Sequence, residues 1–187
     1  MIRPDENKDK ATFELSDEEL KKIVAETDTG GRKPTGFAAK VLLLVALGWS
    51  LLQLWIASPL PFTFGVFVFN DTEARSVHLA LAVFLAFLAY PALKRSPRDR
   101  IPVGDWVLAG VGAFCMAYLF LFYRELAGRP GLPTTMDLVV AVCGLILLLE
   151  AARRALGLPM VILSAVFIGY VFLGPYMPDV IAHRGAS

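Results

Sequence analysis

The feature that most constrains this chain is a series of long apolar stretches. Residues 41–56 carry no charged side chain, and further apolar stretches follow at about 73–93, 103–123 and 134–150. A helix needs about 20 mainly apolar residues to cross the ~30 Å hydrocarbon core of a bilayer. Hydrophobic residues make up 56% of the chain and charged residues 19%, against about 45–50% and about 25% in soluble domains. The sequence therefore favours an integral membrane protein over a water-soluble enzyme.

We predict an all-α integral membrane protein with about five transmembrane helices. The spans are expected at 37–57, 73–93, 103–123, 134–150 or one turn further, and, in a shorter helix, 158–173. Asn70 to Thr72 offers capping side chains for the second span, and Thr134 with Asp137 predicts a capping box for the fourth. Residues 62–69 are apolar but too few to cross, so they are expected to form an interfacial or re-entrant segment.

A polar arm precedes the first span. Ser16 and Glu19 have capping-box spacing and are followed by apolar residues at helical intervals, which predicts a short amphipathic helix ending near Glu26. About 36 polar residues come before the first apolar stretch, so we expect no signal peptide and a first span retained as an anchor. The expected domains are a polar arm at 1–36, a four-helix membrane region at 37–157, and a fifth helix with a tail at 158–187.

The distribution of basic residues predicts the orientation of these spans. If the predicted spans alternate in direction, fourteen of the 18 Lys and Arg residues lie on the side of the membrane that holds the N-terminus, and four lie on the other side. Cytoplasmic flanks of membrane helices are enriched in Lys and Arg. The N-terminus is therefore expected on the cytoplasmic side and the C-terminus on the outer side. Because acidic and basic residues nearly balance over the chain, bulk charge gives no reason to expect a nucleic-acid partner.

Motifs that carry enzyme chemistry are not found in the sequence. His78 and His183 belong to no close metal-ligand pattern, and neither a nucleophile elbow nor a phosphate-binding glycine loop is present. We therefore expect no enzyme activity, no catalytic residues, no cofactor and no metal site.

Two charged clusters at span ends are the candidate functional residues. Glu73, Arg75 and His78 lie in the first turns of the second span, where Arg75 and His78 are expected to share a face. Glu150, Arg153 and Arg154 lie at the end of the fourth span, with ion-pair spacing. Charges near membrane depth are costly and are usually paired or functional. Each cluster is predicted either to anchor its helix or to contact another subunit.

Several stretches, taken in order, resemble the N-terminal region of tripartite ATP-independent periplasmic (TRAP) transporter permeases. The similarity is to the fused type associated with TAXI binding proteins, and it covers about Glu14 to Ser187. The matching stretches are ETDTGGR (26–32), LWIASPLP (54–61), FNDTEARSVHL (69–79), YP (90–91), KRSPRDR (94–100), PTT (133–135), LEAARR (149–154), GPYMP (174–178) and AHRG (182–185).

This resemblance implies a bacterial inner-membrane protein that supports sodium-coupled uptake of small organic acids. In the family, a small four-helix component supports a much larger permease component that holds the substrate and sodium sites, and a soluble periplasmic protein delivers substrate. The implied partners are therefore the large component, fused or separate, a TAXI-type solute-binding protein, and the lipid bilayer. The resemblance assigns no substrate or sodium ligand to this chain. The alternative is a stand-alone membrane scaffold or assembly factor that takes no part in transport.

Overall fold

The computed structural model describes residues 30–93 and 96–178, and every regular element within them is helical. Residues 31–93 and 96–178 belong to one compact unit. The amphipathic helix predicted between Ser16 and Glu26 lies outside the described residues. The elements are α2 (Gly36–Ala57), α3 (Leu60–Phe64), α4 (Asp71–Ala89), α5 (Val103–Leu121), α6 (Tyr123–Ala127), α7 (Thr135–Leu156), α8 (Leu158–Leu173) and the 3₁₀ turn η1 (Gly174–Tyr176).

Four of the described helices, α2, α4, α5 and α7, are long and apolar enough to cross a membrane. They contain 19 to 22 residues each, or about 28–33 Å at 1.5 Å per residue. The apolar α8 has 16 residues and is therefore about 24 Å long, shorter than the hydrocarbon core. The fold is thus that of an all-α, multi-pass membrane protein, and a crossing by α8 stays a prediction.

Capping boxes open two of the four long helices. The Asn70 side chain accepts a hydrogen bond from the backbone N–H of Glu73 at 2.9 Å, and the Glu73 carboxylate accepts from the backbone N–H of Asn70 at 3.0 Å. Thr134 and Asp137 make the same reciprocal pair at the start of α7, at 3.3 and 2.7 Å. Both satisfy backbone donors that a helix start leaves free. The predicted box at Thr134 and Asp137 is confirmed.

The helix ends depart from the predicted spans where the local backbone changes direction. Helix α4 ends at Ala89 rather than near residue 93, because Tyr90 precedes Pro91 and is extended (φ −113°, ψ 127°); a following proline disfavours helical backbone. Helix α5 ends at Leu121, and Phe122 (φ −112°, ψ 24°) separates it from the short α6. The membrane helices are therefore slightly shorter here than the apolar stretches suggest.

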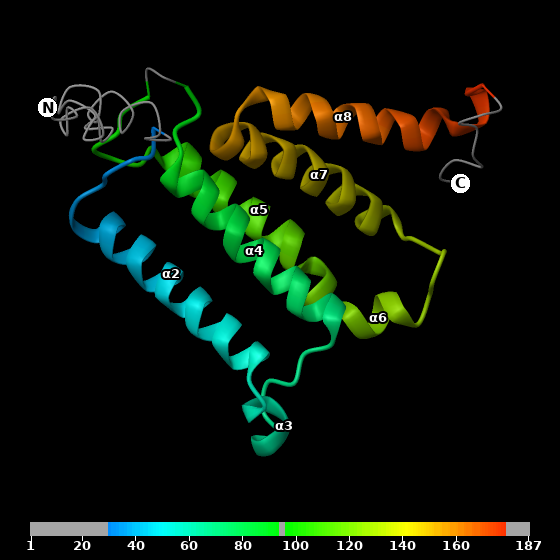
Figure 1. Cartoon of the computed structure of the whole chain (residues 1–187), viewed down its shortest axis with the longest axis horizontal. Helices are drawn as coiled ribbons and strands as arrows, with labels where there is room; N and C mark the ends of the chain where they lie inside the picture. The colour runs from blue at the N-terminus through cyan, green and yellow to red at the C-terminus, as the bar shows by residue number, and fades with distance from the viewer. Residues whose placement is uncertain (1–29, 94–95, 179–187) are drawn as a thin grey trace, which may run out of the picture. The chain divides into compact units, whose positions relative to one another are not determined.

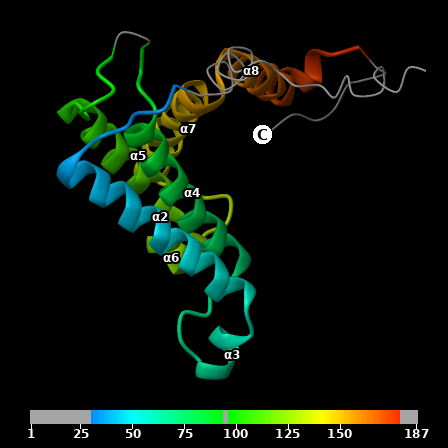
Figure 2. The same ribbon diagram turned by 60° about the vertical axis from the view of Figure 1, so that its left-hand side comes forward.

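Helices α4 and α5 form the most extensive helix pair, with α2 packed on α4 and with α7 packed on both α5 and α4 (Figure 1). The second view shows the same order, with α2 and α7 on different sides of α4 (Figure 2). The core contains Val83, Phe87, Leu88, Ala109 and Ala151. Gly112 allows the close approach of α5 to α4, because a Cβ there would lie 2.8 Å from Cγ1 of Val83.

The outward surface of this region is apolar. None of the residues of α2 or α8 is buried, and four leucines along α2, Leu44, Leu47, Leu51 and Leu54, are each more than half exposed. Contiguous exposed apolar patches of this extent are rare on soluble monomers and mark surfaces that contact lipid or protein. Side chains that a soluble protein would bury therefore face outward here, as a membrane environment requires.

Helix α3 and the loop after it occupy the predicted interfacial segment. Helix α3 lies beyond the C-terminal end of α2 and contacts it (Figure 1). Phe62, Phe64 and Phe67 are exposed, and Phe67 has a positive φ of 51°, which is uncommon for a residue other than glycine. Trp55 of α2 stacks on Phe64, with ring centroids 6.3 Å apart. Helix α3 has five residues, too few to cross a bilayer, and an interfacial or re-entrant path of this segment stays a prediction.

Candidate functional site

A network of five charged side chains joins the helix ends where α2 and α5 begin and α4 and α7 end. Its members are Arg32 before α2, Asp105 on α5, and Glu150, Arg153 and Arg154 on α7. They alternate in sign, in the order Arg32, Asp105, Arg154, Glu150, Arg153. We call this set the ion-pair network; its net formal charge is positive by one.

Arg32 is the most buried member, and its side chain is fully inaccessible. Its Nη2 donates to Oδ2 of Asp105, while Nη1 donates to the carbonyl oxygens of Phe87 and Leu88 at 3.2 Å each. Its backbone N–H donates to the carbonyl of Ala89 at 2.7 Å. The last carbonyls of a helix have no partner inside the helix and carry partial negative charge. Arg32 therefore caps the C-terminus of α4 and ties it to α5.

Arg154 connects the two carboxylates of the network. Its Nη1 lies 2.8 Å from Oδ1 of Asp105, and its Nε lies 2.8 Å from Oε1 of Glu150. Its guanidinium carbon lies 4.7 Å from the centre of the Phe87 ring on α4, within the range of a cation–π contact. Its side chain is only 3% exposed. Arg154 therefore holds the end of α7 against both α5 and α4.

Arg153 forms the more accessible end of the network. Its Nε and Nη2 donate to the two carboxylate oxygens of Glu150 at 2.7 and 2.8 Å, and Nη2 also donates to the carbonyl of Ala92 at 2.9 Å. This parallel geometry is the strong, directional form of an arginine–carboxylate contact. The side chains of Arg153 and Glu150 are 33% and 29% exposed. Arg32, Asp105 and Arg154 are thus the buried part of the network, and Glu150 and Arg153 are the more accessible part.

A second polar cluster joins α5 to α7 at the opposite end of the helices. The Tyr118 hydroxyl donates to Oδ1 of Asp137 at 2.7 Å, and Nη1 of Arg129 lies 2.7 Å from Oδ2. The Asp137 side chain, 10% exposed, also completes the capping box with Thr134. One carboxylate therefore links α5, the loop after α6 and the start of α7.

The other predicted cluster, at the start of α4, is divided among different contacts. Glu73 serves its capping box. Arg75 pairs with Asp71 at 3.0 Å in an exposed contact within α4. His78 instead faces α2: Trp49 Nε1 donates to its Nδ1 at 3.3 Å, and Gln53 Nε2 contacts the same nitrogen. The three residues thus serve separate local contacts, and their role toward another subunit stays a prediction.

Sequence reasoning singled out Glu150, Arg153 and Arg154 but not the two residues that complete their network. Arg32 lies within the predicted polar arm, and Asp105 lies in the first turn of the third predicted span. Asp105 is nevertheless the one charged residue within 103–121, and an ionised side chain in a span calls for a partner. That signal pointed to a partner for Asp105; the choice of Arg32 and Arg154 required the fold.

The arrangement supports a structural role for the network rather than a binding centre. Each carboxylate oxygen of Asp105 and Glu150 already accepts from an arginine, so these groups are occupied by one another. No group of three or more His, Cys, Asp or Glu that could hold a metal occurs in residues 30–93 and 96–178. The network ties the C-terminal ends of α4 and α7 and the start of α5 to the segment before α2.

Together, the four long apolar helices and the networks that join their ends define the class: an all-α, multi-pass membrane protein. Comparison of the chain with protein-family models, curated proteins and solved structures finds no match.

Proposed function

We propose that this chain is the membrane scaffold of a TRAP transporter permease in a bacterial inner membrane. In this role it supports sodium-coupled uptake of small organic acids, which a periplasmic binding protein of the TAXI type delivers. The proposal includes a fifth span through α8, a cytoplasmic N-terminus and a periplasmic C-terminus. Its large partner is the permease component that carries the substrate.

The observation that carries the proposal is the buried ion-pair network. A scaffold against which another component moves must keep its own helices fixed, and the network ties three helix ends and the segment before α2 together. Arg32 closes the ETDTGGR stretch, and Arg154 closes the LEAARR stretch, both of which underlie the family resemblance. The residues that resemble the family are thus also residues that make the unit rigid.

The outward apolar surface supports the same role. The α2 leucines and the whole of α8 present apolar side chains outward, which suits helices that broaden the membrane footprint of a larger assembly. The charged members of the ion-pair network contact one another instead of facing a cavity, as expected of a component that does not itself carry an ionic substrate.

A deletion experiment in the native host tests this function. We expect removal of the coding segment to abolish sodium-dependent uptake of at least one member of a panel of radiolabelled small organic acids. Re-expression should restore it, and the purified 187-residue chain in liposomes should give no uptake alone. Unchanged uptake in the deleted strain would favour the stand-alone scaffold. Uptake by the purified chain would contradict a scaffold role.

A further inference from the structure

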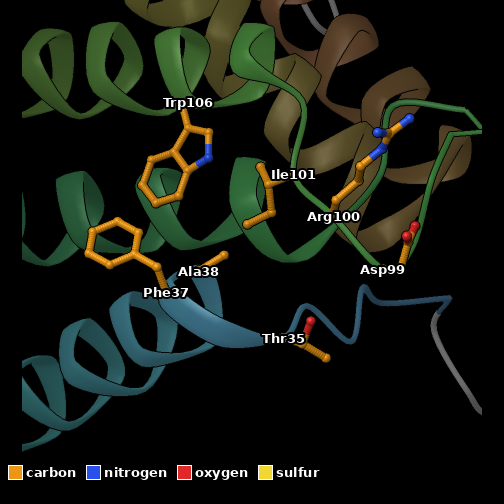
Figure 3. A pocket seen from close by; sticks show the side chains of 7 residues that line it. All are labelled: Thr35, Phe37, Ala38, Asp99, Arg100, Ile101 and Trp106. Atoms are coloured by element: carbon orange, nitrogen blue, oxygen red, sulfur yellow. The ribbon is translucent and has the colours of Figure 1, made fainter.

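A groove opens between the start of α2 and the start of α5, beside the ion-pair network. It encloses about 430 Å³ and is lined by Thr35, Phe37, Ala38, Asp99, Arg100, Ile101 and Trp106. Figure 3 shows Phe37 and Trp106 toward one side of the groove and Thr35, Asp99 and Arg100 toward the other, with the Arg100 guanidinium directed away from Thr35. The groove is thus apolar on the side of the membrane helices and polar on the side of the loops.

Hydrogen bonds at the polar end hold the two walls of the groove at a fixed separation. The backbone N–H of Lys33 donates to the carbonyl of Arg98 at 3.0 Å, and Nε of Arg32 donates to the carbonyl of Pro97 at 3.4 Å. At the apolar end, Trp106 packs edge-to-face on Phe84 of α4, with centroids 6.4 Å apart. The groove is therefore largely formed before any ligand enters, which lowers the entropic cost of binding.

The exposed charge around the polar end is positive. Arg100 lines the groove and is exposed, and Lys33 and Arg98, joined by a backbone hydrogen bond next to it, are exposed as well. None of the three takes part in an ion pair among the described residues. Lys40 is exposed one turn into α2. Asp99 is the one exposed acidic side chain at this end within the described residues. The buried ion-pair network beside the groove adds one further positive charge.

We propose that this groove binds one anionic phospholipid. The aromatic and aliphatic wall would hold the upper part of an acyl chain, while Lys33 and Arg100 hold the phosphate group. Basic pockets between membrane helices attract anionic head groups, and each basic side chain near the membrane surface contributes roughly 1 kcal/mol, or about fivefold in occupancy. A bound lipid would also fill the gap between α2 and α5, which otherwise meet through α4. This inference does not depend on the transport role.

Trp106 provides a direct probe. In the full chain carrying Trp49→Phe and Trp55→Phe, Trp106 is the single tryptophan. The protein is placed in nanodiscs of phosphatidylcholine that contain a small, equal fraction of dibrominated phosphatidylglycerol or dibrominated phosphatidylcholine. We expect the anionic brominated lipid to quench Trp106 several-fold more strongly, since one basic contact alone gives about fivefold enrichment. A matched chain with Trp55 alone, at the far end of α2, should be quenched equally by both.

Charge variants distinguish lipid binding in the groove from a general electrostatic attraction of anionic lipids to the protein surface. Arg100→Ala and Lys33→Ala, each in the Trp106 background, should reduce the preference about fivefold, whereas Arg124→Ala, an exposed arginine at the opposite end, should leave it unchanged. Glycerol 3-phosphate, which has the anion without acyl chains, should not displace the brominated lipid. Equal quenching of Trp106 by both lipids, no quenching by either, or a preference that survives Arg100→Ala and Lys33→Ala would overturn the proposal.

Discussion

At the residue scale, Asp105 is the side chain on which the ion-pair network depends most, because it accepts from both Arg32 and Arg154. Replacing a buried ion pair by apolar groups can be nearly neutral, but removing one partner leaves a buried charge uncompensated. Without the Asp105 carboxylate, Arg32, whose side chain is 0% exposed, would lose its counter-ion, and Arg154, 3% exposed, would keep only Glu150.

We therefore expect Asp105→Asn to lower the free energy of unfolding by roughly 3–5 kcal/mol. Unfolding in mixed micelles, followed by circular dichroism, measures this. Asp71→Asn is the matched control: Asp71 also pairs with an arginine, Arg75, but both side chains are more than three-quarters exposed, and exposed pairs contribute little. Equal losses in the two variants would show that the Asp105 pairs are no stronger than a surface contact.

At the element scale, glycines decide how closely α5 approaches α4. Gly112 is buried, and a Cβ there would lie 2.8 Å from Val83 Cγ1 and 3.2 Å from Phe87 Cε2. Both neighbours belong to the core and are at most 2% exposed, so neither side chain has room to move. Gly110, in the same helix, faces open space.

We predict opposite outcomes for the two alanine substitutions. Gly112→Ala should destabilise the helix pair by about 1–3 kcal/mol through overpacking. Gly110→Ala should be neutral or slightly stabilising, because alanine favours helix by up to about 1 kcal/mol over glycine. Thermal unfolding of both variants in the same detergent measures the difference. A Gly112→Ala protein as stable as Gly110→Ala would mean that α4 and α5 are further apart than the structure has them.

At the scale of the whole molecule, the number of helices that cross the membrane and their direction determine on which side each loop lies. The positive-inside pattern predicts that the loop after α4 lies in the cytoplasm and the loop after α6 outside. The 16-residue α8 decides the location of the C-terminal end: if it crosses, η1 lies outside, and if it lies along the membrane, η1 lies inside.

Single cysteines in a Cys115→Ala, Cys143→Ala chain measure this topology. We expect a membrane-impermeant maleimide to label Leu132→Cys and Tyr176→Cys in intact cells, and Leu93→Cys only after permeabilisation. All three positions are more than 60% exposed, so a lack of labelling reports the side of the membrane. Labelling of Tyr176→Cys only after permeabilisation would show that α8 does not cross the membrane. Labelling of Leu93→Cys alone in intact cells would show that the orientation is opposite to the predicted one.

The elements were predicted from sequence with different success along the chain. The bounds of α8 agree with the prediction, because Gly157 precedes its apolar stretch. The end of α2 at Ala57 also agrees, because Ser58 and Pro59 follow it, whereas α2 begins one residue earlier than predicted. The end of α4 was placed four residues too late, because Pro91 acts through the backbone of Tyr90, while the residues from Pro91 to Leu93 still count as mainly apolar. Hydropathy thus locates a span, but local backbone sterics end the helix.

What the sequence determined by itself is the membrane class, the order of the helices and the capping box of α7. These depend on apolar length and on side chains three residues apart, which are local properties of the chain. Only the tertiary structure decided that Arg32 and Arg154 share Asp105, because these pairs join residues 73 and 49 positions apart. The same holds for the groove between α2 and α5, whose walls come from separate segments. Contacts at such separations exist only once the packing of α4, α5 and α7 has brought the helix ends together.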